Sequence, residues 1–68
     1  MSTITKRQAE VLSFIKTYYD KWNCAPTLKE IAQVFNTSYQ SIWTTINALE
    51  TAGRIKREPN KERGIEIV

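Results

Sequence analysis

The sequence predicts a single, mainly α-helical domain that ends in a small β-hairpin, with three helices followed by a two-stranded antiparallel sheet. Two amphipathic segments, residues 6–22 and 28–35, each begin directly after the N-cap threonine of a capping box. A third segment, residues 39–52, follows a short turn and is almost free of charge. Two short alternating stretches, residues 54–57 and 64–67, flank a turn-forming sequence and predict the hairpin.

The first predicted helix begins after Thr5, whose hydroxyl can accept from the backbone of Gln8 while the Gln8 side chain reaches back. Its apolar residues recur on one stripe: Val11, Leu12, Ile15, Tyr18 or Tyr19, and Trp22. Because an isolated helix of this length is marginal in water, we expect the stripe to be buried against other elements.

The second predicted helix is separated from the first by Pro26, which disfavours helical geometry in the residue before it. Thr27 and Glu30 form a second capping box. The helix is expected to end near Asn36, a residue type that tolerates the left-handed conformation. Its expected inward residues are Leu28, Ile31, Ala32 and Phe35.

The third predicted helix follows a turn of three or four residues, in which Thr37 and Ser38 are both competent N-caps. Ile42, Ile46 and Leu49 recur at helical spacing and are expected to point into the core. The opposite side consists of Gln40, Trp43, Thr44 and Asn47. Two helices joined by so short a link indicate a helix-turn-helix, which places the start of its second helix in the major groove of DNA.

The outward side of this helix is polar but uncharged. No Lys, Arg, Asp or Glu occurs from Ile31 to Leu49, although 25% of all residues are charged. A solvated helix usually carries charges on this side, so a neutral side predicts contact with base edges in a major groove or with a partner protein. A surface helix that merely lacks charge is the alternative.

The hairpin is expected to begin after Gly53, which ends the third helix in the left-handed conformation. It should turn Ile55, Ile65 and Ile67 inward and project its tip, Pro59–Glu62, as a wing. Its cations suit the phosphate backbone or a minor groove, and a hairpin charged only for solubility is the alternative. The ten residues 54–63 carry Arg54, Lys56, Arg57, Lys61 and Arg63 against Glu58 and Glu62, an excess equal to the net charge of +3. The whole chain, residues 1–68, is thus predicted to be one winged helix-turn-helix domain.

The composition argues against several function classes. With Cys24 as the single cysteine and no histidine, we expect no metal site, no disulfide within the chain and no cofactor. We predict no catalytic residue, since no nucleophile lies beside a recognisable base and no glycine-rich phosphate loop occurs. The carboxylates of Glu10, Glu30 and Glu50 are interpreted as helix-surface and capping groups. No apolar run reaches membrane-spanning length, so we expect a soluble, cytoplasmic protein that binds no membrane.

Three segments of the chain resemble the N-terminal winged-helix DNA-binding domain of LexA-type SOS repressors. They are TKRQAEVLSFIKTYYDKW, APTLKEIAQVF and LETAGRIKREPNKERGIEIV, and they cover nearly the whole length. The more specific parts are Lys6-Arg7-Gln8, Pro26-Thr27 and Arg63-Gly64-Ile65-Glu66-Ile67. The resemblance implies a helical bundle with a small hairpin that binds operator DNA as a dimer and represses transcription.

The sequence departs from this family in three respects. LexA proteins carry a second domain with a Ser/Lys self-cleaving site and the dimer interface. This chain stops where that domain would begin, so we expect a stand-alone domain that neither cleaves itself nor dimerises through that surface. The link after Phe35 is one residue shorter and lacks the apolar residue that usually follows the position of Asn36. The residue types at the base-contacting positions also differ, most of all at Trp43.

The predicted site residues fall into two groups. Counting back from Gly53, the resemblance places the base-contacting positions of the family at Ser38, Gln40, Ser41, Trp43 and Thr44, and the outward side of the helix adds Asn47. Gln40 is expected to pair with an adenine edge and Thr44 to touch a thymine methyl group. The predicted phosphate contacts are Lys6, Arg7, Lys56, Arg57, Lys61 and Arg63. The predicted function is sequence-specific binding of double-stranded DNA by a small transcriptional regulator, a repressor.

Three contacts are possible for the Trp43 side chain: a DNA groove, a protein partner or the hairpin. Because large exposed aromatics often anchor protein interfaces, the alternative function is a protein-interaction module that binds another regulator or enzyme through Tyr39 and Trp43. A binder of RNA or single strands is less favoured, since the aromatics fall mainly on core stripes. A monomer on one half-site should bind weakly, so specificity implies a second copy on a palindromic site or another regulatory protein.

Overall fold

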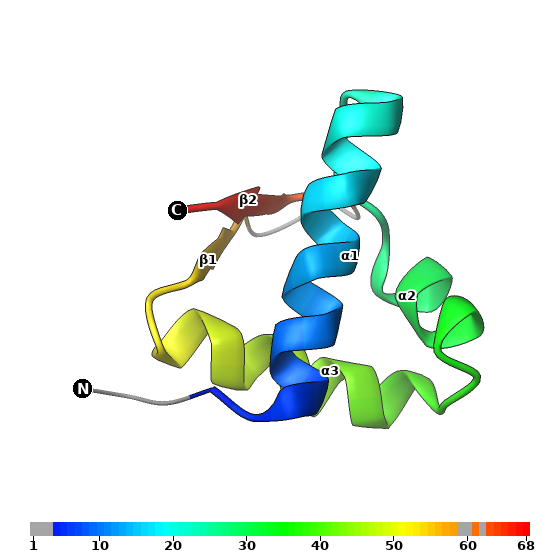
Figure 1. Cartoon of the computed structure of the whole chain (residues 1–68), viewed down its shortest axis with the longest axis vertical. Helices are drawn as coiled ribbons and strands as arrows, with labels where there is room; N and C mark the ends of the chain where they lie inside the picture. The colour runs from blue at the N-terminus through cyan, green and yellow to red at the C-terminus, as the bar shows by residue number, and fades with distance from the viewer. Residues whose placement is uncertain (1–3, 59–60, 62) are drawn as a thin grey trace.

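The computed structural model of the protein describes residues 4–58, 61 and 63–68. Three helices are followed by a two-stranded antiparallel sheet, which confirms the predicted winged helix-turn-helix (Figure 1). The elements are α1 (Lys6–Trp22), α2 (Leu28–Val34), α3 (Tyr39–Thr51), β1 (Ile55–Arg57) and β2 (Ile65–Ile67). The predicted helices 28–35 and 39–52 each end one residue too late, and the predicted strands 54–57 and 64–67 each begin one residue too early.

The helices begin at the predicted caps. Thr5 and Thr27 each accept a hydrogen bond from the backbone three residues on, and Gln8 and Glu30 complete the two capping boxes. Ser38, one of the two candidates, is the N-cap of α3. Each cap satisfies backbone N–H groups that a helix start would otherwise leave without a partner.

The ends of α2 and α3 share one left-handed motif. Asn36 after α2 has a φ of 53°, and Gly53 after α3 has a φ of 76°, which confirms both predicted positions. The N–H groups of these residues and of the residue after each donate back to carbonyl groups in the last helical turn. Phe35 and Ala52 are therefore C-caps rather than helical residues, which accounts for the earlier helix ends.

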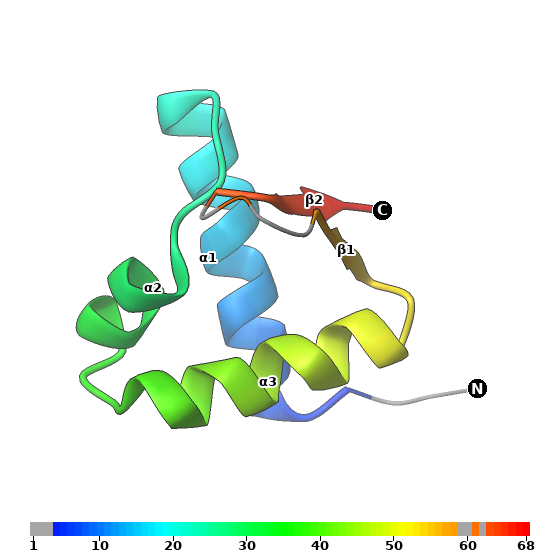
Figure 2. The ribbon, with the colours of Figure 1, turned by 180° about the vertical axis from the view of Figure 1, so that it is seen from behind.

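The core lies where α1, α2 and the hairpin meet the inward side of α3. In both views α3 crosses α1 near the first turn of α1 (Figures 1 and 2). The predicted inward residues of α3 are confirmed, since all three are buried. The buried apolar residues are Val11, Leu12, Ile15, Ala25, Ile31, Ala32, Ile42, Ile46, Leu49, Ile55 and Ile65.

The prediction that Trp22 belongs to the buried stripe of α1 is wrong, because this side chain is 58% exposed. The last turn of α1 extends beyond the other elements (Figure 1). The apolar stripe therefore continues past the part of the molecule that could cover it.

The hairpin pairs Ile55 with Ile67 across its two strands. Ile55 and Ile65 are buried and Ile67 packs partly buried against the core, which confirms the predicted inner side. Gly64 is needed where the strands approach each other, since a Cβ there would lie 2.7 Å from the carbonyl oxygen of Glu58. Of the predicted wing tip, Pro59, Asn60 and Glu62 lie outside the described residues.

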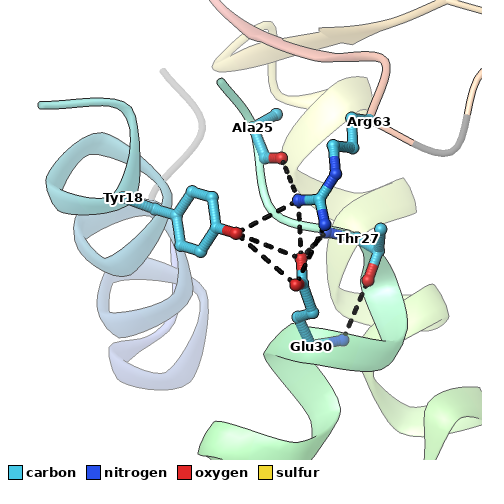
Figure 3. Close-up of polar contacts among 5 residues, drawn as sticks. All are labelled: Tyr18, Ala25, Thr27, Glu30 and Arg63. Atoms are coloured by element: carbon cyan, nitrogen blue, oxygen red, sulfur yellow. Dashed lines mark hydrogen bonds and ion pairs between the residues drawn. The ribbon is translucent and has the colours of Figure 1, made fainter. Parts of the chain in front are cut away.

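A cluster that we call the Arg63 clasp joins the hairpin to α1 and α2. It consists of Arg63, Glu30, Tyr18 and Ala25 (Figure 3). Two guanidinium nitrogens of Arg63 donate to the two carboxylate oxygens of Glu30, at 2.8 and 3.1 Å. One of these nitrogens also donates to the Tyr18 hydroxyl at 3.1 Å and to the Ala25 carbonyl oxygen at 3.0 Å. The clasp therefore holds the chain just before β2 against the start of α2.

Glu30 serves both the clasp and the capping box of α2. Hydrogen bonds from Arg63, and next from the backbone N–H of Thr27, lower the pKa of Glu30 from 4.5 to about 2. A carboxyl group whose pKa is lower in the folded state stabilises the fold above its unfolded pKa. We therefore expect this contribution to be complete at neutral pH and to be lost as the pH falls from 4.5 towards 2.

Replacing Glu30 with glutamine should lower the melting temperature at pH 7 by on the order of 5 °C, because the neutral amide loses the charge-assisted hydrogen bonds from Arg63. The substitution should also reduce the loss of stability between pH 4.5 and pH 2, since the titrating group is gone. Thermal unfolding followed by circular dichroism over this pH range measures both effects.

The control is Glu10→Gln, which removes an exposed carboxylate of α1 without touching the clasp. It should leave the melting temperature and its pH dependence nearly unchanged. Equal melting temperatures for Glu30→Gln and the unsubstituted protein at pH 7 would contradict a stabilising role for the clasp.

Candidate nucleic-acid interface

The predicted base-facing residues lie at the start of α3 and along its outward side. Ser38 at the N-cap and Gln40, Ser41 and Thr44 are exposed, and Asn47 is half-buried. Helical periodicity explains this arrangement, because the buried residues of α3 occupy the opposite side. The structure therefore brings these residues together on one surface.

Internal hydrogen bonds determine which polar groups of this surface remain available. The Oγ atom of Ser38 accepts from the backbone N–H of Ser41 at 3.1 Å and keeps its own O–H for another acceptor. The Thr44 hydroxyl donates to the carbonyl oxygen of Gln40 at 3.1 Å. Thr44 therefore offers a methyl group and an accepting oxygen rather than a free donor.

Tyr39 and Trp43 lie one turn apart along α3 and are 55% and 44% exposed. Both line an open groove of about 780 Å³ between α3, the start of α2 and the hairpin. Leu28, Lys29 and Lys61 also line this groove. In Figure 2 the framing elements are α2 at the left, α3 below and the hairpin above. Nearly half of the Trp43 side chain thus remains open to a partner.

Lys6 and Arg7 are exposed in the first turn of α1, and this turn lies beside α3 in both views (Figures 1 and 2). The guanidinium carbon of Arg7 lies 5.3 Å from the centre of the Phe35 ring. This cation–π contact orients the Arg7 side chain without neutralising its charge. The start of α1 therefore presents positive charge close to the candidate interface.

The cations of the hairpin differ in their surroundings. The Nε atom of Arg57 lies 3.8 Å from a Glu50 carboxylate oxygen, and the Nζ atom of Lys61 lies 3.1 Å from a Glu58 carboxylate oxygen. Such solvent-exposed pairs contribute little and exchange readily with other anions. Lys56 is exposed and forms no ion pair within the part of the chain that the structure describes.

Arg63 differs from the other predicted phosphate contacts because its guanidinium belongs to the Arg63 clasp. Its nitrogens already donate to a carboxylate, a hydroxyl and a backbone carbonyl. We therefore assign Arg63 a structural role. No local pattern indicated this pairing, since Glu30 lies 33 residues earlier in the chain.

Lys29 is a candidate contact that the sequence patterns did not single out. It is exposed in the first turn of α2 and lines the groove beside Tyr39. Helical periodicity could have placed Lys29 on the outward side of its helix. Its position at the groove depends on how α2 packs against α3, which periodicity does not reveal.

Among the described residues, no group of three or more His, Cys, Asp or Glu side chains is arranged to hold a metal ion. Cys24 is a half-buried free thiol. None of the helices in the described ranges combines the length and the apolar character needed to cross a membrane.

A three-helix domain with an exposed third helix, a four-residue turn before it and a two-stranded sheet after it is a winged helix-turn-helix protein. The family model for the LexA DNA binding domain matches residues 1–64, and the chain belongs to this family.

Similar proteins include the LexA repressor of Staphylococcus carnosus, 36% identical over 69 residues that cover 100% of this chain and 33% of the repressor. LexA repressor 2 of Geobacter sulfurreducens is 37% identical over 68 residues, which cover 98% of this chain and 34% of that protein. The chain thus spans about a third of the length of these relatives.

Replacing Trp43 with alanine should lower the free energy of unfolding by less than about 2 kcal/mol, because the side chain is 44% exposed and only partly packed. Replacing Ile46, which is fully buried, should cost about 2–5 kcal/mol. Urea unfolding of both variants provides the comparison. A loss for Trp43→Ala as large as that for Ile46→Ala would show that Trp43 is part of the core.

Proposed function

We propose that this protein binds double-stranded DNA in a sequence-specific manner and acts as a small transcriptional repressor. In this proposal α3 enters the major groove, and cations of α1 and of the hairpin bind the phosphate backbone. The observation that carries the proposal is the exposed, uncharged outward side of α3 with basic residues on neighbouring elements. Membership of the LexA DNA-binding domain family supports DNA rather than a protein as the partner.

The base-facing set consists of Ser38, Gln40, Ser41, Trp43, Thr44 and Asn47. The first half of α3 carries most of these side chains, and a helix-turn-helix presents this part of its second helix to base edges. The major groove is wide enough for a helix and distinguishes all four base pairs through hydrogen bonds and methyl groups. Polar, uncharged side chains at these positions are suited to this form of recognition.

The phosphate-binding set consists of Lys6, Arg7, Lys56, Arg57 and Lys61. Arg57 and Lys61 would exchange their exposed acidic neighbours for phosphates. Arg63 is left out because the Arg63 clasp occupies its guanidinium. These contacts would supply affinity for any duplex and position α3 on it.

Chemical-shift perturbation of backbone amides during titration with a random-sequence duplex of about 20 base pairs should affect residues 38–47 and the described residues of 56–63. With about four to five phosphate contacts, the logarithm of the affinity should fall with the logarithm of the salt concentration with a slope of about −4. Unchanged amide shifts in a folded protein would contradict DNA binding.

Lys56→Ala should reduce the magnitude of this slope by about one, because one phosphate contact is lost. Lys16→Ala removes an exposed lysine of α1 outside the proposed set and serves as the matched control. A salt dependence that Lys56→Ala leaves unchanged would exclude Lys56 from the phosphate-binding set.

One copy on one half-site would bind weakly, so the proposal includes a second copy on a palindromic site or another regulatory protein. We expect a palindromic duplex to bind two copies and a single half-site to bind one. Gel filtration with light scattering on the two complexes measures the stoichiometry. One copy on the palindromic duplex would favour another regulatory protein as the second component.

A further inference from the structure

We propose that α3 selects A·T base pairs, reading adenine through Gln40 and thymine methyl groups through Thr44 and Trp43. This inference rests on the proposed function, since it concerns which base pairs the DNA-facing helix recognises. It follows from the chemical groups that α3 presents and from those that it lacks.

The outward side of α3 lacks the charged groups that read G·C pairs. Guanine presents two acceptors in the major groove and is most often read by Arg or Lys, whereas the cytosine amino group is read by Asp or Glu. None of these residue types occurs from Ile31 to Leu49. The next carboxylate on α3, that of Glu50, lies 3.8 Å from Arg57 in an ion pair.

Gln40 supplies the pairing that adenine requires. Adenine presents an acceptor, N7, beside a donor, the N6 amino group, and a side-chain amide matches both at once. Gln40 is exposed in the first turn of α3, whereas the amide of Asn47 is half-buried two turns later. Gln40 is therefore the amide with freer access to a base edge.

Thr44 lies one helical turn after Gln40, so the two side chains are neighbours on the surface of α3. The Thr44 hydroxyl donates to the Gln40 carbonyl oxygen at 3.1 Å, which makes Thr44 a poor donor to a base. The Thr44 methyl group remains for an apolar contact. The adjacent Trp43 adds a large, 44% exposed apolar surface. Because successive residues point about 100° apart around a helix, Thr44 and Trp43 each offer a separate apolar contact to a thymine methyl group.

The first test is selection of binding sites from a random duplex pool by the whole chain. We expect A·T pairs at the base pairs of each selected half-site that the bound protein covers. A covered half-site made mainly of G·C pairs would overturn the inference.

The second test replaces each thymine of the selected half-site with deoxyuridine, which removes only the methyl group. Losing one buried methyl contact should weaken binding by about fourfold. Thr44→Ser deletes the methyl group and keeps the hydroxyl, so it should abolish this preference at one thymine. Trp43→Ala should abolish it at a neighbouring thymine.

The controls are Thr17→Ser and Trp22→Ala, which alter exposed residues of α1 and should keep the full preference for thymine. Equal affinity of the unsubstituted protein for the thymine and deoxyuridine duplexes would refute the inference. So would an unchanged preference in both the Thr44→Ser and Trp43→Ala variants.

The two levels of the proposal fail in different ways. If no duplex binds in a salt-dependent manner, the proposed function is wrong and the inference fails with it. If duplexes bind with the expected salt dependence but without a preference for thymine over deoxyuridine, only the inference is wrong.

Discussion

The fold depends on the burial of one side of α3. Ile42, Ile46 and Leu49 are at most 1% exposed and lie where α1, α2 and the hairpin meet. A chain of 68 residues buries a smaller share of its surface than a larger domain, so a single core has to hold every element. Burying this side turns the opposite one outward. Stability and the proposed DNA recognition are thus assigned to opposite sides of the same helix.

The hairpin depends on the helices for its position. A two-stranded hairpin is at best marginally stable alone, and this one is anchored by the burial of Ile55 and Ile65. The Tyr19 hydroxyl of α1 donates to the carbonyl oxygen of Ile65, and the Arg63 clasp joins the same region to α2. These contacts hold the hairpin, which carries Lys56, against the helices.

The distribution of charge separates two tasks in the proposed function. Cations at the start of α1 and on the hairpin would attract any duplex, because phosphate contacts carry no direct sequence information. The uncharged side of α3 would discriminate between base pairs through hydrogen bonds and apolar contacts. A modest net charge of +3 agrees with this division, since the cations lie on elements that neighbour α3 rather than on its recognition surface.

Local patterns in the sequence specify the element order, the helix caps and the inward side of α3. These features depend on groups a few residues apart, such as the hydroxyl of Thr27 and the backbone of Glu30, or on the left-handed conformation of Gly53. The binding of Arg63 to Glu30 and the exposure of Trp22 follow instead from how the elements pack in three dimensions. An ion pair across 33 residues, or the end of an apolar stripe beyond its neighbours, depends on which elements meet in space, and spacing along the chain does not encode that directly.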